Sequence, residues 1–145
     1  MTLGECTLTG KPCRHSSTFA ANPLASTTAM AAIDVVLDEG LSNRALRLGA
    51  LLRERLVSLK APPQANHKVT GQGLLMALHI DESHPSGRVT ATRLCKLALK
   101  KGLIVIPTQN RIRIAPPLII SEEDLWKGVD ILEAALNELV VLDEI

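Results

Sequence analysis

Aromatic residues are nearly absent from this chain of 145 residues, which has one Trp, one Phe and no Tyr. Its core must therefore be aliphatic, and a binding site built from stacked rings is not expected. The chain also lacks a run of Lys and Arg, and its net charge is only +1. Without a basic run or an aromatic platform to hold phosphates or bases, nucleic-acid binding is not expected.

Long apolar runs and cysteine frameworks are missing as well. No run reaches the ~18 apolar residues of a membrane span, and the N-terminus shows neither a secretory nor a transit pattern, so no membrane partner is expected. Cys6, Cys13 and Cys95 are too widely spaced for a zinc motif or a disulfide framework. The four His residues do not cluster at metal-ligand spacing either. We therefore expect no metal site and a reducing cytoplasmic compartment, with the mitochondrial matrix as the alternative.

The apolar periodicity predicts the order helix-helix-strand-strand-helix-strand-strand-helix. Asn22-Pro23 is a typical helix start, and Ser42 is predicted to cap the second helix. Helices are predicted over residues 22–38, 42–60, 89–101 and 121–142, and strands over 67–70, 74–80, 103–106 and 111–114. This order predicts an α+β fold, in which the helices pack mainly on one face of a small, mainly antiparallel sheet.

The most informative single residue is Arg113, on a predicted short strand that ends at two prolines. Alternation places Ile112 and Ile114 on one face of the strand and Arg111 and Arg113 on the other. A guanidinium on a half-buried strand needs an anionic partner, and its planar fork matches a carboxylate. From the strand alone, that partner is either a carboxylate-bearing ligand or one of the 15 acidic residues of the chain.

Three ordered motifs connect the chain to a known family. Residues 15–25, His-Ser-Ser-Thr-Phe-Ala-Ala-Asn-Pro-Leu-Ala, resemble the His-Gly-Ser-Thr-Phe-Gly-Gly-Asn-Pro-Leu-Ala stretch of class III pyridoxal-phosphate aminotransferases. Residues 69–75, Val-Thr-Gly-Gln-Gly-Leu-Leu, resemble the Arg-Gly-x-Gly-Leu turn and strand of that family. Residues 102–118, with Gly-Leu, Pro-Thr and Arg-Ile-Ala-Pro-Pro-Leu, resemble its ornithine aminotransferase branch in particular.

The resemblance implies the small C-terminal domain of a fold-type I aminotransferase. Residues 1–21 would be the end of the large cofactor-binding domain, 22–40 the connecting helix and 41–145 the small domain. The implied cofactor is pyridoxal 5′-phosphate, whose phosphate would be contacted by Ser17 and Thr18 across a subunit boundary in a homo-oligomer.

For Arg113, the resemblance implies contact with a substrate carboxylate, which favours the ligand interpretation over an internal ion pair. The implied reaction transfers an amino group from ornithine to a 2-oxo acid and gives glutamate 5-semialdehyde. None of the seven lysines stands in the family's Schiff-base motif. The isolated chain is therefore expected to have no catalytic residue and to be inactive.

Several departures from the family pattern leave alternatives open. Ser16 and Ala20-Ala21 replace glycines, Thr70 replaces an arginine, and the turn before Arg113 is one residue shorter. One alternative is a non-catalytic truncated paralogue that acts only as a folded or interacting fragment. Another is a fragment of an acetylornithine or 4-aminobutyrate aminotransferase.

Overall fold

The computed structural model describes residues 22–60, 65 and 67–141. The chain forms two compact units, with the boundary between Glu39 and Gly40. The described part of the first unit is helix α1 (Pro23–Asp38), which begins as predicted, since the side chain of Asn22 accepts a hydrogen bond from the backbone N–H of Ala25 at 2.8 Å. No side chain of α1 is buried.

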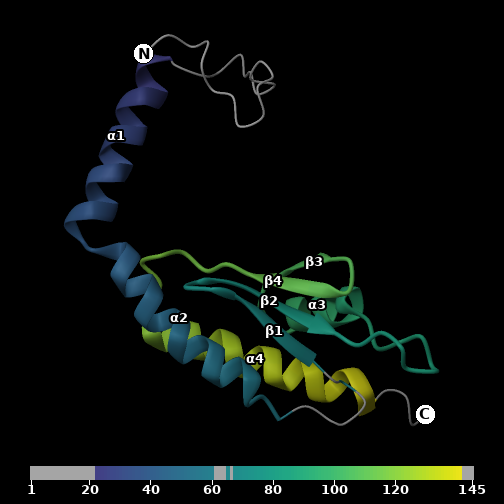
Figure 1. Cartoon of the computed structure of the whole chain (residues 1–145). Coiled ribbons are helices and arrows are strands. Elements are labelled where there is room, and N and C mark those ends of the chain that lie inside the picture. Colours follow the sequence, from purple (N-terminus) through teal and green to yellow (C-terminus); the bar gives the residue numbers. More distant parts are fainter. Residues whose placement is uncertain (1–21, 61–64, 66, 142–145) are drawn as a thin grey trace, which may run out of the picture. The chain divides into compact units, whose positions relative to one another are not determined.

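The described residues of the second unit form seven elements, which follow the predicted order (Figure 1). They are α2 (Leu41–Val57), β1 (His67–Gln72), β2 (Leu75–Ile80), α3 (Ala91–Lys100), β3 (Ile106–Thr108), β4 (Arg111–Ile114) and α4 (Glu122–Val141). The strands form one sheet in the order β1-β2-β4-β3, and every pairing is antiparallel. The predicted α+β fold is confirmed.

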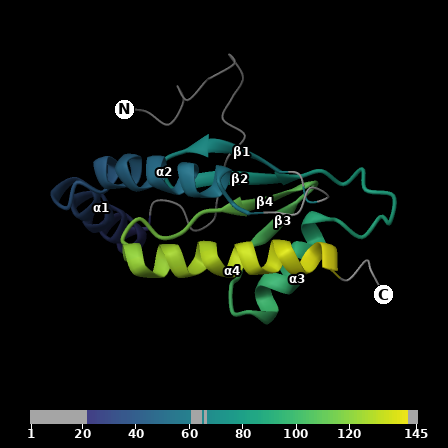
Figure 2. The ribbon, with the colours of Figure 1, turned by 90° about the horizontal axis from the view of Figure 1, so that it is seen from below.

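One face of the sheet carries the aliphatic core. Figures 1 and 2 show α2 and α4 along the same side of the sheet, and α3 packs against α4. The side chains that face these helices are buried together with the inner faces of all three, including Val69, Met76, Leu78, Ile80 and Ile112 of the sheet and Leu48, Leu52, Leu94, Leu132 and Leu136 of the helices. The single core is aliphatic, as the shortage of aromatic residues predicted.

A close approach of α2 to the β1–β2 turn fixes the hairpin under the helix. Gly73 in this turn has a φ of +57°, a left-handed conformation that glycine adopts without strain. A Cβ added to Gly49 on α2 would lie 2.2 Å from the carbonyl oxygen of Gly73. Two glycines that are distant in the sequence are therefore both required where helix and turn meet.

The predicted bounds of α2 were wrong at both ends. The helix begins after Gly40, which has a left-handed backbone with a φ of +58° and no side-chain cap, rather than at Ser42. It ends at Val57 rather than Lys60, because the backbone N–H of Lys60 donates to the carboxylate of Glu133 on α4 at 3.0 Å. A tertiary contact thus replaces the last helical turn.

The third predicted strand and the start of the third helix were also misplaced. Residues 103–105 are not a strand, since the backbone N–H of Leu103 donates to Ala98 and closes the end of α3. Strand β3 starts only at Ile106. Thr90 caps α3 by accepting from the backbone N–H of Arg93 at 3.2 Å, so this helix starts two residues later than predicted. No helix in the described residues is both long and apolar enough to cross a membrane.

Candidate functional site

Arg113 lies on β4, whose two neighbouring strands fix the direction of its side chain. Its backbone pairs with Ala77 on β2 and with Ile106 on β3. Ile112 beside it is fully buried, whereas the side chain of Arg113 is exposed. Because successive residues of a strand point to opposite faces, Arg113 lies on the face of the sheet that the helices do not cover.

Within the described residues, Arg113 takes part in no ion pair. The ion pairs found there join residues of the helices and the end of α3 instead, as in Arg47–Glu122 and Arg55–Asp130, each at 2.8 Å. An exposed guanidinium keeps most of its hydration, so it does not require an internal carboxylate for folding. This arrangement favours the ligand interpretation of Arg113 over the structural ion pair.

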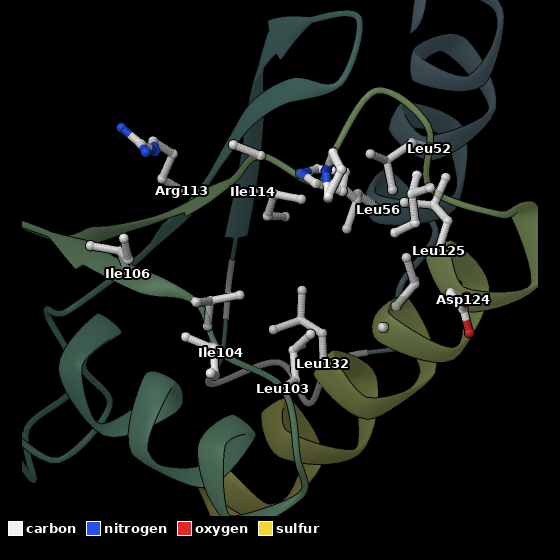
Figure 3. Close-up of a pocket in the computed structure, with 17 residues that line it drawn as sticks. Leu52, Leu56, Leu103, Ile104, Ile106, Arg113, Ile114, Asp124, Leu125 and Leu132 are labelled. Carbon is white, nitrogen blue, oxygen red and sulfur yellow. The ribbon is translucent and has the colours of Figure 1, made fainter. Parts of the chain in front are cut away.

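An apolar cleft of about 340 Å³ lies beside Arg113, between the β3–β4 edge, the segment that follows β4 and helix α4. Only two charged side chains, Arg113 and Asp124, are among the residues that line it. Figure 3 shows both charged groups pointing away from the Leu and Ile side chains at its centre. The cleft is lined mainly by Leu52, Leu56, Leu103, Ile104, Ile106, Ile114, Leu125 and Leu132. It can therefore accept apolar groups, while the guanidinium of Arg113 points away from it (Figure 3).

Arg44 on α2 holds the segment that follows Arg113. Its guanidinium donates to the backbone carbonyls of both Leu118 and Ile120. These carbonyls follow Pro116-Pro117, where the chain has left the sheet and has no strand partner, so they need another donor. This role of Arg44 could not be predicted from the sequence, because a basic residue on an amphipathic helix gives no local sign of a long-range backbone contact.

The described residues do not provide a complete pyridoxal-phosphate site. No lysine lines the cleft, and Lys101 and Lys127 are ion-paired at 2.8 Å to Glu138 and Glu123. This cofactor requires a lysine and a set of phosphate contacts. The predicted phosphate-contacting residues, Ser17 and Thr18, lie outside the described residues, so their role stays a prediction.

The chain matches the family model "Aminotransferase class-III" over residues 3–136. It is 43% identical over 140 residues to ornithine aminotransferase car2 of Schizosaccharomyces pombe, covering 96% of this chain and 31% of that protein. It is 45% identical over 133 residues to the ornithine aminotransferase of Emericella nidulans, covering 91% of this chain and 29% of the relative. The chain thus spans about 30% of the length of these curated relatives.

Solved structures that superpose on this chain are also aminotransferases. The acetylornithine aminotransferase of Elizabethkingia anophelis superposes with a TM-score of 0.72 and 44% identity, over 88% of this chain and 33% of that one. The ornithine aminotransferase of Toxoplasma gondii, whose structure shows PLP at partial occupancy in its active site, has a TM-score of 0.74 and 28% identity over 93% of this chain and 32% of its own. The chain belongs to the class III aminotransferase family, and it corresponds to the C-terminal part of that fold.

Proposed function

We propose that this chain forms the small C-terminal domain of a pyridoxal-phosphate-dependent ornithine aminotransferase. The complete enzyme moves an amino group from ornithine to a 2-oxo acid and releases glutamate 5-semialdehyde and an amino acid. The observation that carries this proposal is the exposed guanidinium of Arg113 beside an apolar cleft, which has no ion-pair partner among the described residues, in a chain 43–45% identical to fungal ornithine aminotransferases.

In this proposal Arg113 binds a substrate carboxylate. Strands β2 and β3 pair with β4 on either side and hold the Cα of Arg113 in place. Arg44 fixes the segment that follows β4. A guanidinium held in this way can donate two parallel hydrogen bonds to a carboxylate.

The cofactor and the remaining catalytic groups come from outside the described residues. Pyridoxal phosphate supplies the electron sink for the amino transfer when it is bound. Ser17 and Thr18 contact its phosphate in the neighbouring subunit of a homo-oligomer, and a lysine from the rest of the enzyme holds its aldehyde. The isolated chain has no such lysine and is inactive. Residues 1–21, 22–40 and 41–145 belong to the large domain, the connecting helix and the small domain.

A second candidate substrate is acetylornithine. The solved acetylornithine aminotransferase of Elizabethkingia anophelis is 44% identical to this chain, which is as high as the identity to the curated ornithine enzymes. Arg113 can bind the carboxylate of either amino acid, so it does not distinguish them. A non-catalytic truncated paralogue is the remaining alternative, and it predicts that no complete enzyme containing this chain is active.

A chimera tests these assignments together. The stretch of the Schizosaccharomyces pombe relative that matches this chain is replaced by residues 1–145, and transamination is measured with ornithine and with acetylornithine. Arg113→Lys keeps the charge but loses the fork, so the loss of one charge-assisted bond, about 1.5–3 kcal/mol, weakens substrate affinity by about ten- to a hundredfold. Arg88→Ala, which removes an exposed charge from a loop, is the matched control.

The melting temperature separates ligand binding from a structural role of Arg113. We expect it to be nearly unchanged in Arg113→Ala and Arg113→Lys, because no described carboxylate loses a partner. An unchanged KM for both substrates together with a large fall in melting temperature would show that Arg113 is a structural residue.

A further inference from the structure

Arg113 lies close to the end of its strand. It is the last residue but one of β4, and the pairing of β4 with β2 ends at the next residue, where Ile114 pairs with Met76. The pairing with β3 ends at Arg113 itself, which pairs with Ile106. The ends of elements open more easily than their centres. What holds the chain beyond Ile114 therefore decides how firmly Arg113 is kept in place.

The residues that follow β4, Ala-Pro-Pro-Leu (115–118), form a stiff link. Each proline ring fixes its own φ and leaves no backbone N–H that could continue the ladder with β2. A residue that precedes a proline is also restricted to extended conformations. The backbone N–H of Ile120 donates to the carbonyl of Pro117 at 3.0 Å, which turns the chain toward α4. Because the link is stiff, a displacement at Leu118 is carried back to the end of β4.

Arg44 on α2 anchors this link through its side chain. Its Nη1 donates to the carbonyl of Leu118 and its Nη2 to the carbonyl of Ile120. Figures 1 and 2 show the link running from β4 past α2 to the start of α4. A planar guanidinium with two engaged nitrogens fixes the orientation of the chain as well as its position. Among the described residues, no other side chain donates to residues 115–120.

The other arginines that join α2 to α4 act beyond the link. Arg47 pairs with Glu122 and Arg55 pairs with Asp130, each at 2.8 Å, and both acids lie on α4 itself. All four side chains are about half exposed, and such ion pairs contribute little to stability. These pairs hold helix to helix, whereas Arg44 holds the backbone that leads out of β4.

We propose that Arg44 is a positioning residue for substrate binding, which acts by keeping the end of β4 closed and thereby orienting Arg113. The inference rests on the proposed function, in which Arg113 binds a substrate carboxylate. A group that is already ordered loses less conformational freedom when its ligand binds. Arg44 thus contributes to affinity without contacting the substrate, because two backbone carbonyls already engage its guanidinium.

A double-mutant cycle in the chimera with the Schizosaccharomyces pombe relative tests this role. We expect Arg44→Ala to raise KM for the carboxylate substrates about tenfold, within the range for residues of one network, and to leave kcat nearly unchanged. In an Arg113→Lys background the same substitution should change KM by less than about twofold, because the contact that Arg44 supports is already lost. Arg44→Lys, which keeps the charge but not the fork, should give an intermediate KM.

Arg55→Ala is the matched control, since it removes an arginine of the same helix that does not contact the link. It should leave KM unchanged. All rates are measured well below the lowest melting temperature of the set, so that a loss of overall stability does not reduce the amount of folded enzyme. If Arg44→Ala does not fold in the chimera, the Arg44→Lys variant completes the cycle with Arg113→Lys.

Hydrogen exchange of the 145-residue chain tests the mechanical link without cofactor or substrate. We expect the amides of β4 to exchange faster in Arg44→Ala, by a larger factor than those of β1. A general loss of stability would speed exchange in both strands alike. In Arg55→Ala the two strands should keep the ratio that they have in the unsubstituted chain.

Two outcomes would overturn the positioning role. The first is an equal rise in KM with Arg113 and with Lys at position 113, which would make the effect of Arg44 purely structural. The second is an unchanged ratio of exchange between β4 and β1 in Arg44→Ala. An inactive chimera, or a KM that does not respond to Arg113→Lys, would instead refute the proposed function. Faster exchange in β4 would then still show that Arg44 holds the end of the strand.

Discussion

The contact between Gly49 and Gly73 gives a sharp prediction about stability. Gly49 lies within α2, where alanine is normally the better helix former by about 1 kcal/mol. Its added Cβ, however, would lie 2.2 Å from the carbonyl oxygen and 2.4 Å from the Cα of Gly73. Ordinary contact begins near 3.4 Å, so the shortfall is 1.2 Å, and the atoms that the Cβ meets belong to the backbone. No rotamer change can relieve it.

The matched control is Gly128→Ala in α4. There the added Cβ would lie 3.6 Å from a side-chain methyl of Leu103, which is ordinary contact. Overpacking costs about 1–3 kcal/mol, with Gly49→Ala near the upper end because α2 and the hairpin must separate. After the helix-propensity gain, we expect Gly49→Ala to lower the free energy of unfolding by about 1–2 kcal/mol. Gly128→Ala should raise it by about 1 kcal/mol.

Urea unfolding followed by the fluorescence of Trp126 measures both variants. Trp126 is the only tryptophan and packs against the core, so its emission reports the cooperative transition. The two variants should differ by about 2–3 kcal/mol, which corresponds to a midpoint difference of about 1 M for a typical small domain. Equal midpoints would refute the packing argument, because they would show that α2 does not rest on the backbone of this turn.

Two further predictions concern contacts of the helices. Arg44→Ala should lower the free energy of unfolding by about 1.5–3 kcal/mol, because it leaves the carbonyls of Leu118 and Ile120 without their donor; thermal unfolding of this variant and of the control Arg88→Ala, at an exposed loop position, measures the loss. The hydrogen bond from Lys101 lowers the pKa of the Glu138 carboxyl. This stabilising contribution is present above the ordinary Glu pKa and is lost as pH falls through the lowered value. Glu138→Gln should therefore flatten the acid limb of a plot of urea midpoint against pH, and an unchanged slope would contradict the contact.

The order of elements could be predicted because each is specified by its own residues. Apolar spacing of three and four indicates α4, and Asn22-Pro23 marks the start of α1 without reference to anything distant. Two of the errors occur where a group elsewhere in the chain accepts a backbone hydrogen bond and ends the predicted element. The α2 helix stops early because Glu133 captures Lys60, and residues 103–105 leave the sheet because Leu103 closes the end of α3. These partners are visible only after folding.

The site was predictable to a similar degree. The alternation around Ile112 correctly placed Arg113 on the face opposite the core. The expectation that a guanidinium on this half-buried strand needs an internal or bound anion assumed that the charged side chain is itself buried. In the described residues no helix covers that face, so the side chain of Arg113 is exposed instead (Figure 1). Sequence periodicity indicates which face a residue occupies, but not whether another layer covers it.

The motifs that identify the family therefore have separable physical roles. Gly71-x-Gly73 is required by packing, since a Cβ at Gly71 would lie 2.3 Å from the carbonyl oxygen of Leu75 and Gly73 supports α2. The motif that begins at Arg113 presents one charge outward and then turns the chain so that Arg44 can hold it. A substitution in the first motif should therefore change stability in any context. A substitution of Arg113 should matter only where a carboxylate is present to be bound, so the isolated chain and the complete enzyme must respond differently.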